Sequence, residues 1–262
     1  MTMRLIQGDC REVLKTLPDA SIDCCVTDPP YGETSLAWDI SVGGWLSEVR
    51  RVLKPTASLW VFGSMRMFVG MAFPGWKLAQ DVVWEKHNGT GLFNDRFRRV
   101  HEHALQFYRD DAKWSDVFKE PQFTMDATAR TVRKKAKPAH WIGAVGPTSY
   151  TSEDGGPRLQ RSVIYARSEH GRAIHPTQKP VEIVGPLVLY SCPPGGTVLD
   201  CFAGSGTTGL VAQQSGRNAV LIEVNAGYAA LARKRLGLPS TLQDRLADLS
   251  RAVEDLTQAL TR

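Results

Sequence analysis

Short apolar runs alternate with amphipathic stretches along most of the chain. The runs typical of strands are rich in β-branched or aromatic residues and lie at 5–7, 22–27, 58–62, 81–84, 104–108, 197–200 and 219–222. Between them, residues 44–53 and 181–190 have the period of an amphipathic helix, and 207–214 begins another. This alternation predicts an α/β protein with a parallel sheet and helices on its faces.

Residues 110–172 break the alternation. They are rich in proline, glycine, serine, threonine and basic residues, and their aromatic residues follow no clear period. This composition predicts an inserted, loop-rich region that orders itself around a partner.

The C-terminal residues 241–262 carry the most regular pattern in the chain. Apolar residues recur there at spacings of 4, 3, 4, 3 and 4, at Leu242, Leu246, Leu249, Val253, Leu256 and Leu260. Such a heptad pattern predicts a helix that either packs on the protein's own sheet or pairs with a second copy in a homodimer.

Composition places the chain among ordinary globular proteins, with 262 residues, 42% hydrophobic and 23% charged. No apolar run approaches the roughly 20 residues of a membrane span, and the start at Met1–Arg4 does not lead into a signal peptide. The five cysteines form no CxxC pair and have no metal-cage spacing. We therefore expect a cytoplasmic, metal-free enzyme.

The net charge of +5 is unevenly distributed. Residues 95–172 hold fifteen basic against ten acidic residues, and so account for the whole excess. Within eight residues stand Arg130, Arg133, Lys134, Lys135 and Lys137. Such clusters are usually solvated surface, but contact with nucleic-acid phosphates requires them too. Charge alone therefore does not decide whether this region binds nucleic acid.

A glycine-rich loop follows the apolar run at 197–200. Gly204, Gly206 and Gly209 form a GxGxxG pattern between strand and helix, where missing side chains let a ligand touch the backbone. Asp200 ends that strand, and Glu223 ends the next, where a carboxylate can accept from both ribose hydroxyls of an adenosine-containing cofactor. The loop alone does not separate a nicotinamide dinucleotide from S-adenosylmethionine (SAM).

The strand at 22–27 stops at Asp28-Pro29-Pro30-Tyr31. Two prolines end the sheet ladder and stiffen the turn, which leaves an acidic acceptor, a rigid carbonyl and an exposed ring together. Asp28 and the Pro29 carbonyl can accept the two N–H groups of a planar amine while Tyr31 stacks on its ring. A delocalised amine is a poor nucleophile, and two acceptors would stabilise the positive charge that develops as a methyl group arrives.

The order of these two motifs resembles the beta class of amino DNA methyltransferases, in which DPPY precedes FxGxG. Both stand here, at Asp28–Tyr31 and Phe202–Gly206, and the stretches Gly8–Cys10, Trp45–Pro55 and His175–Pro180 are similar as well. The resemblance implies a permuted, seven-stranded, mostly parallel Rossmann-like sheet with an inserted target-recognition region. It divides the chain into a catalytic half (1–109), the insert (110–172), a cofactor-binding half (173–240) and the heptad helix (241–262).

The resemblance also implies roles for single residues: Asp28, Pro29, Pro30 and Tyr31 would be catalytic. SAM would be bound by Asp9, Cys10, Asp28, Thr177, Lys179, Asp200, Phe202, Ala203, Gly204, Ser205, Gly206, Thr207, Glu223 and Asn225, with Asp9 near the adenine and Thr177 and Lys179 near the methionine end. The partner would be double-stranded DNA with its target base flipped out. The candidates for backbone contact are Arg96, Arg98, Arg99, Arg130, Arg133, Lys134, Lys135 and Lys137.

Several alternatives remain open. Cytosine N4 methylation needs the same two acceptors, but in the family Ser-Pro-Pro-Tyr accompanies cytosine, so Asp28 favours adenine N6. Methylation of RNA or of a protein glutamine uses similar motifs, usually with the cofactor motif first. A nicotinamide-dependent dehydrogenase would account for the glycine loop but not for residues 28–31. A DNA-binding repressor would give no function to the predicted catalytic cleft.

Overall fold

The computed structural model describes residues 1–36, 38–90, 95, 97–134, 148–169, 171–242, 249–250, 253 and 257. The chain divides into two compact units. The first unit is formed by Met1–Glu120 together with Ser162–Arg262, and the second by Pro121–Arg161.

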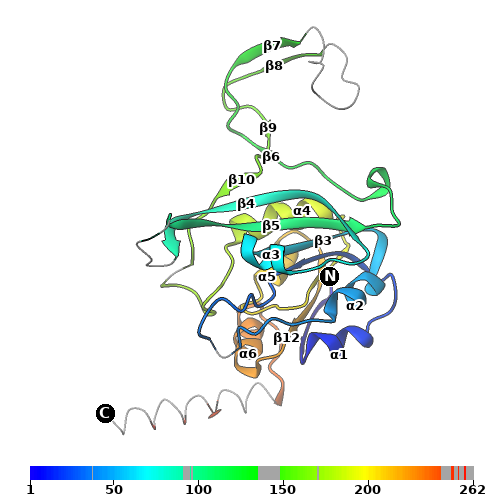
Figure 1. The fold of residues 1–262 in the computed structure, drawn as a ribbon, viewed down its shortest axis with the longest axis vertical. Helices are drawn as coiled ribbons and strands as arrows, with labels where there is room; N and C mark the ends of the chain where they lie inside the picture. Colours follow the sequence, from blue (N-terminus) through cyan, green and yellow to red (C-terminus); the bar gives the residue numbers. More distant parts are fainter. Residues whose placement is uncertain are drawn as a thin grey trace. The chain divides into compact units, whose positions relative to one another are not determined.

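An eight-stranded sheet forms the centre of the first unit (Figure 1). Its order is β1 (Met3–Gln7), β12 (Asn218–Glu223), β11 (Thr197–Asp200), β2 (Ile22–Thr27), β3 (Leu53–Gly63), β5 (Arg99–Arg109), β4 (Trp76–Thr90) and β10 (Val163–Tyr165). Only β5 runs against the other strands of this sheet. The short edge strand β10 is one more than the seven strands expected.

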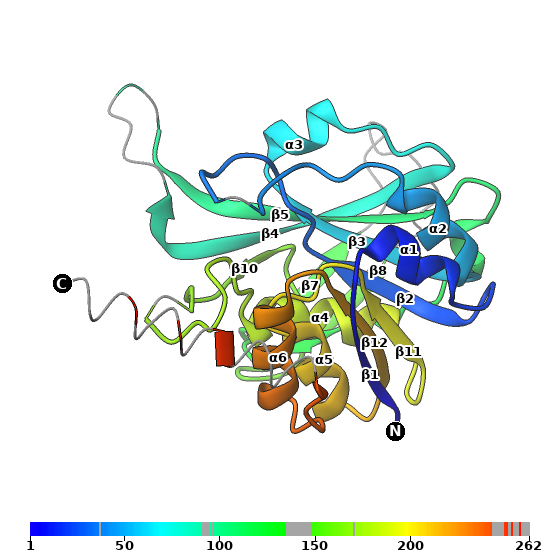
Figure 2. The same cartoon turned by 90° about the horizontal axis from the view of Figure 1, so that it is seen from below.

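Helices cover both faces of the sheet (Figure 2). On one face lie α1 (Cys10–Lys15), α2 (Trp45–Val52) and α3 (Met65–Gly70), and on the other α4 (Val181–Ser191), α5 (Thr207–Gln214) and α6 (Ala226–Arg235), while a 3-10 turn, η1, spans Trp114–Asp116. Cys24 and Val26 pack into the core of α4–α6, whereas Cys25 packs into the core of α1 and α2. Burial on both faces explains why this strand reads as a continuous apolar run.

The seven strands predicted from the pattern are all present, most of them longer than predicted, and the three predicted helices are confirmed. Helices α1, α3 and α6 were not predicted. The first two have six residues each, too few to show a helical period, and α6 lacks a clear apolar stripe. The DPPY strand and the FxGxG strand are neighbours as expected, with Val198 opposite Cys24 and Leu199 opposite Cys25.

The second unit consists of two small antiparallel ribbons. One pairs β6 (Phe123–Thr124) with β9 (Arg158–Leu159), and the other pairs β7 (Arg130–Lys134) with β8 (Thr148–Ser152). The unit is narrower than the insert predicted at 110–172, because both flanks of that region belong to the first unit. β10 pairs with β4 there, and the Glu120 amide donates to the Tyr190 carbonyl at 2.8 Å.

The heptad tail is described at only a few positions. Leu242, Leu249 and Val253 are helical and exposed, whereas Leu246, Leu256 and Leu260 lie outside the described residues. Over the described ranges of the chain, no helix combines the length and the apolar character needed to cross a membrane.

Candidate active site

A cavity of about 200 Å³ lies at the carboxyl edge of the sheet, where β2, β11 and β12 end. Apart from Gly206, all predicted catalytic and cofactor-binding residues line it: Asp9, Cys10, Asp28, Pro29, Pro30, Tyr31, Thr177, Lys179, Asp200, Phe202, Ala203, Gly204, Ser205, Thr207, Glu223 and Asn225. Gly206 shapes the loop itself, since its φ is +74° and a Cβ there would stand 3.2 Å from Leu236. The chain thus brings its two motifs to one cavity.

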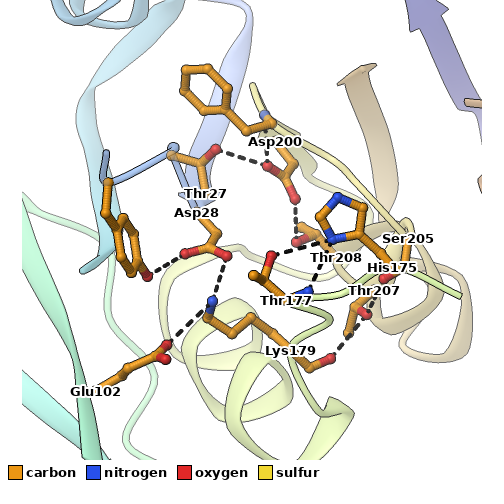
Figure 3. Close-up of polar contacts among 12 residues, drawn as sticks. Thr27, Asp28, Glu102, His175, Thr177, Lys179, Asp200, Ser205, Thr207 and Thr208 are labelled. Atoms are coloured by element: carbon orange, nitrogen blue, oxygen red, sulfur yellow. Dashed lines mark hydrogen bonds and ion pairs between the residues drawn. The ribbon is translucent and has the colours of Figure 1, made fainter. Parts of the chain in front are cut away.

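The DPPY turn presents a carboxylate with two partners (Figure 3). The Tyr31 hydroxyl donates to Asp28 Oδ1 at 2.5 Å, and the Lys179 ammonium pairs with Oδ2. Burial raises the pKa of Asp28, and Lys179 opposes that rise. A carboxylate has about four lone-pair sites, so Asp28 can still accept a hydrogen bond from a ligand.

Asp200 organises the junction between the two motif strands. Its Oδ1 accepts from the Thr27 hydroxyl at 2.8 Å and from the Phe202 amide at 3.1 Å, and its Oδ2 accepts from the Thr208 hydroxyl at 2.7 Å (Figure 3). Burial nevertheless dominates and raises the pKa of Asp200 to about 6. Asp200 therefore ties β2, the glycine loop and α5 together at the cavity wall.

This raised pKa predicts a pH-dependent stability. The pKa of Asp200 in the folded protein, about 6, exceeds the ordinary aspartate value of 3.8, so protonation of Asp200 favours the folded state and this contribution is lost as pH rises through 6. Relative to Asp200→Asn, the wild-type free energy of unfolding should fall by up to about 3 kcal/mol between pH 4 and pH 7. Urea denaturation of both proteins at several pH values measures it. Parallel stability curves would contradict the assignment.

The glycine loop is fixed by the acid that ends β12. The Gly204 amide donates to Glu223 Oε2 at 2.7 Å, and the Asn225 amide donates to Oε1 at 2.8 Å. Gly204 has a φ of +47°, and a Cβ there would come within 3.4 Å of the His175 ring. Gly209 lets α5 approach β12, because a Cβ there would stand 2.5 Å from Leu221. The three glycines thus provide a close loop, a turn and tight helix–strand packing.

The stretch before α4 contributes four polar residues to the cavity wall, His175, Thr177, Gln178 and Lys179. The Thr177 hydroxyl lies 3.2 Å from His175 Nδ1, and the Thr207 hydroxyl donates to the Lys179 carbonyl at 3.0 Å (Figure 3). Burial and the Lys179 charge lower the pKa of His175 to about 4, so its ring is neutral near pH 7. The Lys179 ammonium points to the Asp28 carboxylate, on the acceptor side of the cavity.

Asp9 and Cys10 begin α1 at another side of the cavity. Asp9 is the N-cap residue, accepting from the Arg11 amide at 2.9 Å, and its carboxylate also pairs with the Arg11 guanidinium. Burial raises the pKa of the Cys10 thiol to about 12. Cys10 is therefore a thiol near pH 7 and can contribute packing but no nucleophile.

Sequence reasoning missed several residues of the cavity. Glu102 lines it from β5, and Trp38, from the loop after DPPY, lies 5.1 Å from the His175 ring centroid. Asp39 accepts from the three successive amides of Gly32, Glu33 and Thr34 and so fixes that loop. Glu102 stands between two histidines just before the apolar run at 104–108, and neither it nor the loop residues carried a signal in the sequence.

The basic residues proposed for DNA contact have different surroundings. Arg99 pairs with Glu33 at 3.0 Å, and Arg98 is exposed beside it on the β5 side of the β4–β5 hairpin. In the second unit, Arg130 donates to the Tyr150 hydroxyl at 3.0 Å and Arg133 lies on the same strand, β7. Lys134 ends β7, with its side chain outside the described part; Arg96, Lys135 and Lys137 lie outside it altogether.

The fold is that of the SAM-dependent DNA methyltransferases. The crystal structure of the M1.HpyAVI–SAM complex matches 90% of this chain and 100% of its own, with a TM-score of 0.59 at 23% identity. The cytosine-N4-specific PvuII DNA methyltransferase matches 94% of this chain and 92% of its own, with a TM-score of 0.61 at 17% identity.

The sequence comparisons carry the assignment further. A family model for DNA methylases of the N6 and N4 type matches residues 22–234. The type II methyltransferase M.HinfI of Haemophilus influenzae is 30% identical over 88% of this chain and 67% of its own length. The chain belongs to the N6/N4 DNA methylase family.

Proposed function

We propose that this DNA methyltransferase transfers the methyl group of SAM to the N6 amino nitrogen of an adenine flipped out of duplex DNA. The observation that carries the proposal is the position of Asp28. It stands at the end of β2 with Tyr31 beside it, and it shares one cavity with the glycine loop and Glu223. Donor and acceptor would therefore meet at this edge of the sheet.

The cavity residues fit SAM. The glycine loop offers backbone without side chains where a nucleoside would lie, and the buried Glu223 keeps lone pairs for ribose hydroxyls beyond its two amide bonds. Asp9 would face the adenine and Thr177 the methionine end. When bound there, SAM supplies an electrophilic methyl group.

The chain's own residues would prepare the target amine. Asp28 and the Pro29 carbonyl accept its two N–H groups, which turns the lone pair toward the methyl group and stabilises the developing positive charge. Tyr31 stacks on the flipped base. The methylated nitrogen must then lose a proton. Asp28 already accepts a hydrogen bond from this amine, so its carboxylate is placed to receive the proton.

Each unit by itself carries basic residues that are candidates for contact with the phosphates of duplex DNA. Arg98 and Arg99 of the first unit and Arg130 and Arg133 of the second are the described candidates for phosphate contact, and Lys134 lies on the same β7 strand. The second unit would serve as the target-recognition region. Phosphate contacts fix the register on the duplex, so base reading falls to other side chains.

The test is incubation of the purified chain with SAM and unmethylated genomic DNA, followed by mass spectrometry of the nucleosides. N6-methyladenine from the wild type, absent with Asp28→Ala, would support the proposal. N4-methylcytosine would overturn the base assignment, and no methylated nucleoside with intact SAM binding would overturn the DNA target.

A further inference from the structure

Four charged side chains form a chain of ion pairs beside the DPPY turn. Lys86 on β4 pairs with Glu102 Oε1 on β5. Glu102 Oε2 lies 3.3 Å from the Lys179 ammonium, which in turn pairs with Asp28 (Figure 3). Their side chains are 8%, 12%, 8% and 19% exposed, respectively. Two cations and two carboxylates make this array neutral overall.

The fold by itself gives little reason for such an array. Burying charges costs desolvation, and replacing a buried ion pair with apolar residues of similar volume is often neutral or stabilising. Three of the four, namely Asp28, Glu102 and Lys179, also line the cavity. A function in the cavity therefore explains the array better than stability does.

Lys179 by itself would weaken Asp28 as an acceptor. An ammonium in contact with the carboxylate draws on the negative charge that has to stabilise a developing cation on the amine. Glu102 pairs with the same ammonium from its other side, so the Lys179 charge is divided between two carboxylates. Asp28, Glu102 and Lys179 together then carry a net charge of −1. The Lys179 ammonium also lies 5.7 Å from the Tyr31 ring centroid and 5.4 Å from that of Phe62, so two aromatic rings stand beside it.

We propose that Glu102 is a positioning residue for methyl transfer: it shares Lys179 and thereby keeps Asp28 a strong acceptor for the target amine. Lys86 pairs with Glu102 on the side away from Lys179 and so limits how strongly Glu102 attracts the Lys179 ammonium. The inference rests on the proposed role of Asp28 and deepens it.

The other charged groups around Asp28 do not mask this effect. Burial would raise the pKa of Glu102, but Lys179 and Lys86 outweigh it and lower that pKa to about 2, so Glu102 stays charged through the working range. His175, whose pKa is about 4, is neutral there. Within the described part of the chain, the other charged or titratable groups on this side of the cavity are Tyr31, Asp200 and the Glu33–Arg99 pair. Titration of Asp200 can alter the affinity for SAM, but kcat measured at saturating SAM does not depend on that affinity.

The test measures kcat against pH at saturating SAM and DNA for wild type, Glu102→Gln and Lys86→Met. In Glu102→Gln, the Lys179 ammonium pairs with Asp28 alone, so the pKa of Asp28 falls. The acid limb of the pH–kcat profile, where kcat rises with pH, should therefore move down by about one pH unit, and kcat near pH 7.5 should fall about tenfold. In Lys86→Met, Glu102 takes more of Lys179 and the acid limb should move up. The KM for SAM should stay within about threefold of wild type in both.

Asp23→Asn is the matched control, because Asp23 is also an ion-paired carboxylate, 13% exposed, at the opposite end of β2. Its acid limb should match that of the wild type. Unshifted limbs in both test variants, or shifts in the same direction, would overturn the inference. If Glu102→Gln fails to fold by circular dichroism, the upward shift in Lys86→Met decides. A wild type that methylates nothing would instead count against the proposed function.

Discussion

Replacing Asp28 with asparagine should lower kcat about a thousandfold while the affinity for SAM changes less than tenfold. The asparagine side chain keeps the shape of the carboxylate but loses its charge, and one of its two acceptor atoms becomes a donor. The developing cation on the amine then lacks its main stabilising charge, and its proton lacks a carboxylate to receive it. Single-turnover methylation of a duplex substrate measures the first effect, and equilibrium dialysis with labelled SAM measures the second.

The control is Asp23→Asn, at the start of the strand that Asp28 follows. Asp23 pairs with Lys54 at 2.7 Å and accepts from the Thr197 amide at 2.9 Å, away from the cavity. It should keep wild-type kcat even where stability falls. An Asp28→Asn protein with more than about a tenth of wild-type kcat would contradict the role of Asp28 as the charged acceptor.

Glu223→Gln should weaken SAM binding by about 10- to 100-fold. Both carboxylate oxygens of Glu223 accept backbone amides, from Gly204 and Asn225. Glutamine places an NH₂ group against one of these amides, which leaves a buried donor unpaired and loosens the glycine loop. The same change removes an acceptor for a ribose hydroxyl.

Isothermal titration with SAM measures this loss, and Glu12→Gln on the exposed side of α1 is its control. Glu12 pairs only with Lys15 among its described ion pairs, and its side chain is 72% exposed, so its loss should leave SAM affinity unchanged. If Glu223→Gln binds SAM as tightly as the wild type, Glu223 is not part of the cofactor site. At saturating SAM, kcat should recover more fully in Glu223→Gln than in Asp28→Asn.

The apolar pattern was sufficient for seven of the eight strands of the sheet, because it is read within single elements. The strands at 22–27 and 197–200 are buried on both faces, so their sequences show continuous apolar runs, and their ends coincide with the structure. The pattern failed for six-residue helices such as α1 and α3, where less than two turns of helix carry no period. It also gave no sign of β10, which joins the main sheet through pairing with β4, and no local pattern reports such a pairing.

By itself, the sequence determined where the two motifs stand and that each follows a strand. From this it follows that Asp28 and the glycine loop lie at the carboxyl edge of one sheet, since parallel strands place their carboxyl ends together. Only the tertiary structure decided which charges meet there. Lys86 and Glu102 lie on the adjacent strands β4 and β5, whereas Lys179 lies in the loop before α4, far along the chain. Strand order and register bring all three to Asp28. Ion pairing depends on distances of a few ångströms between side chains, and these distances are set by the packed sheet.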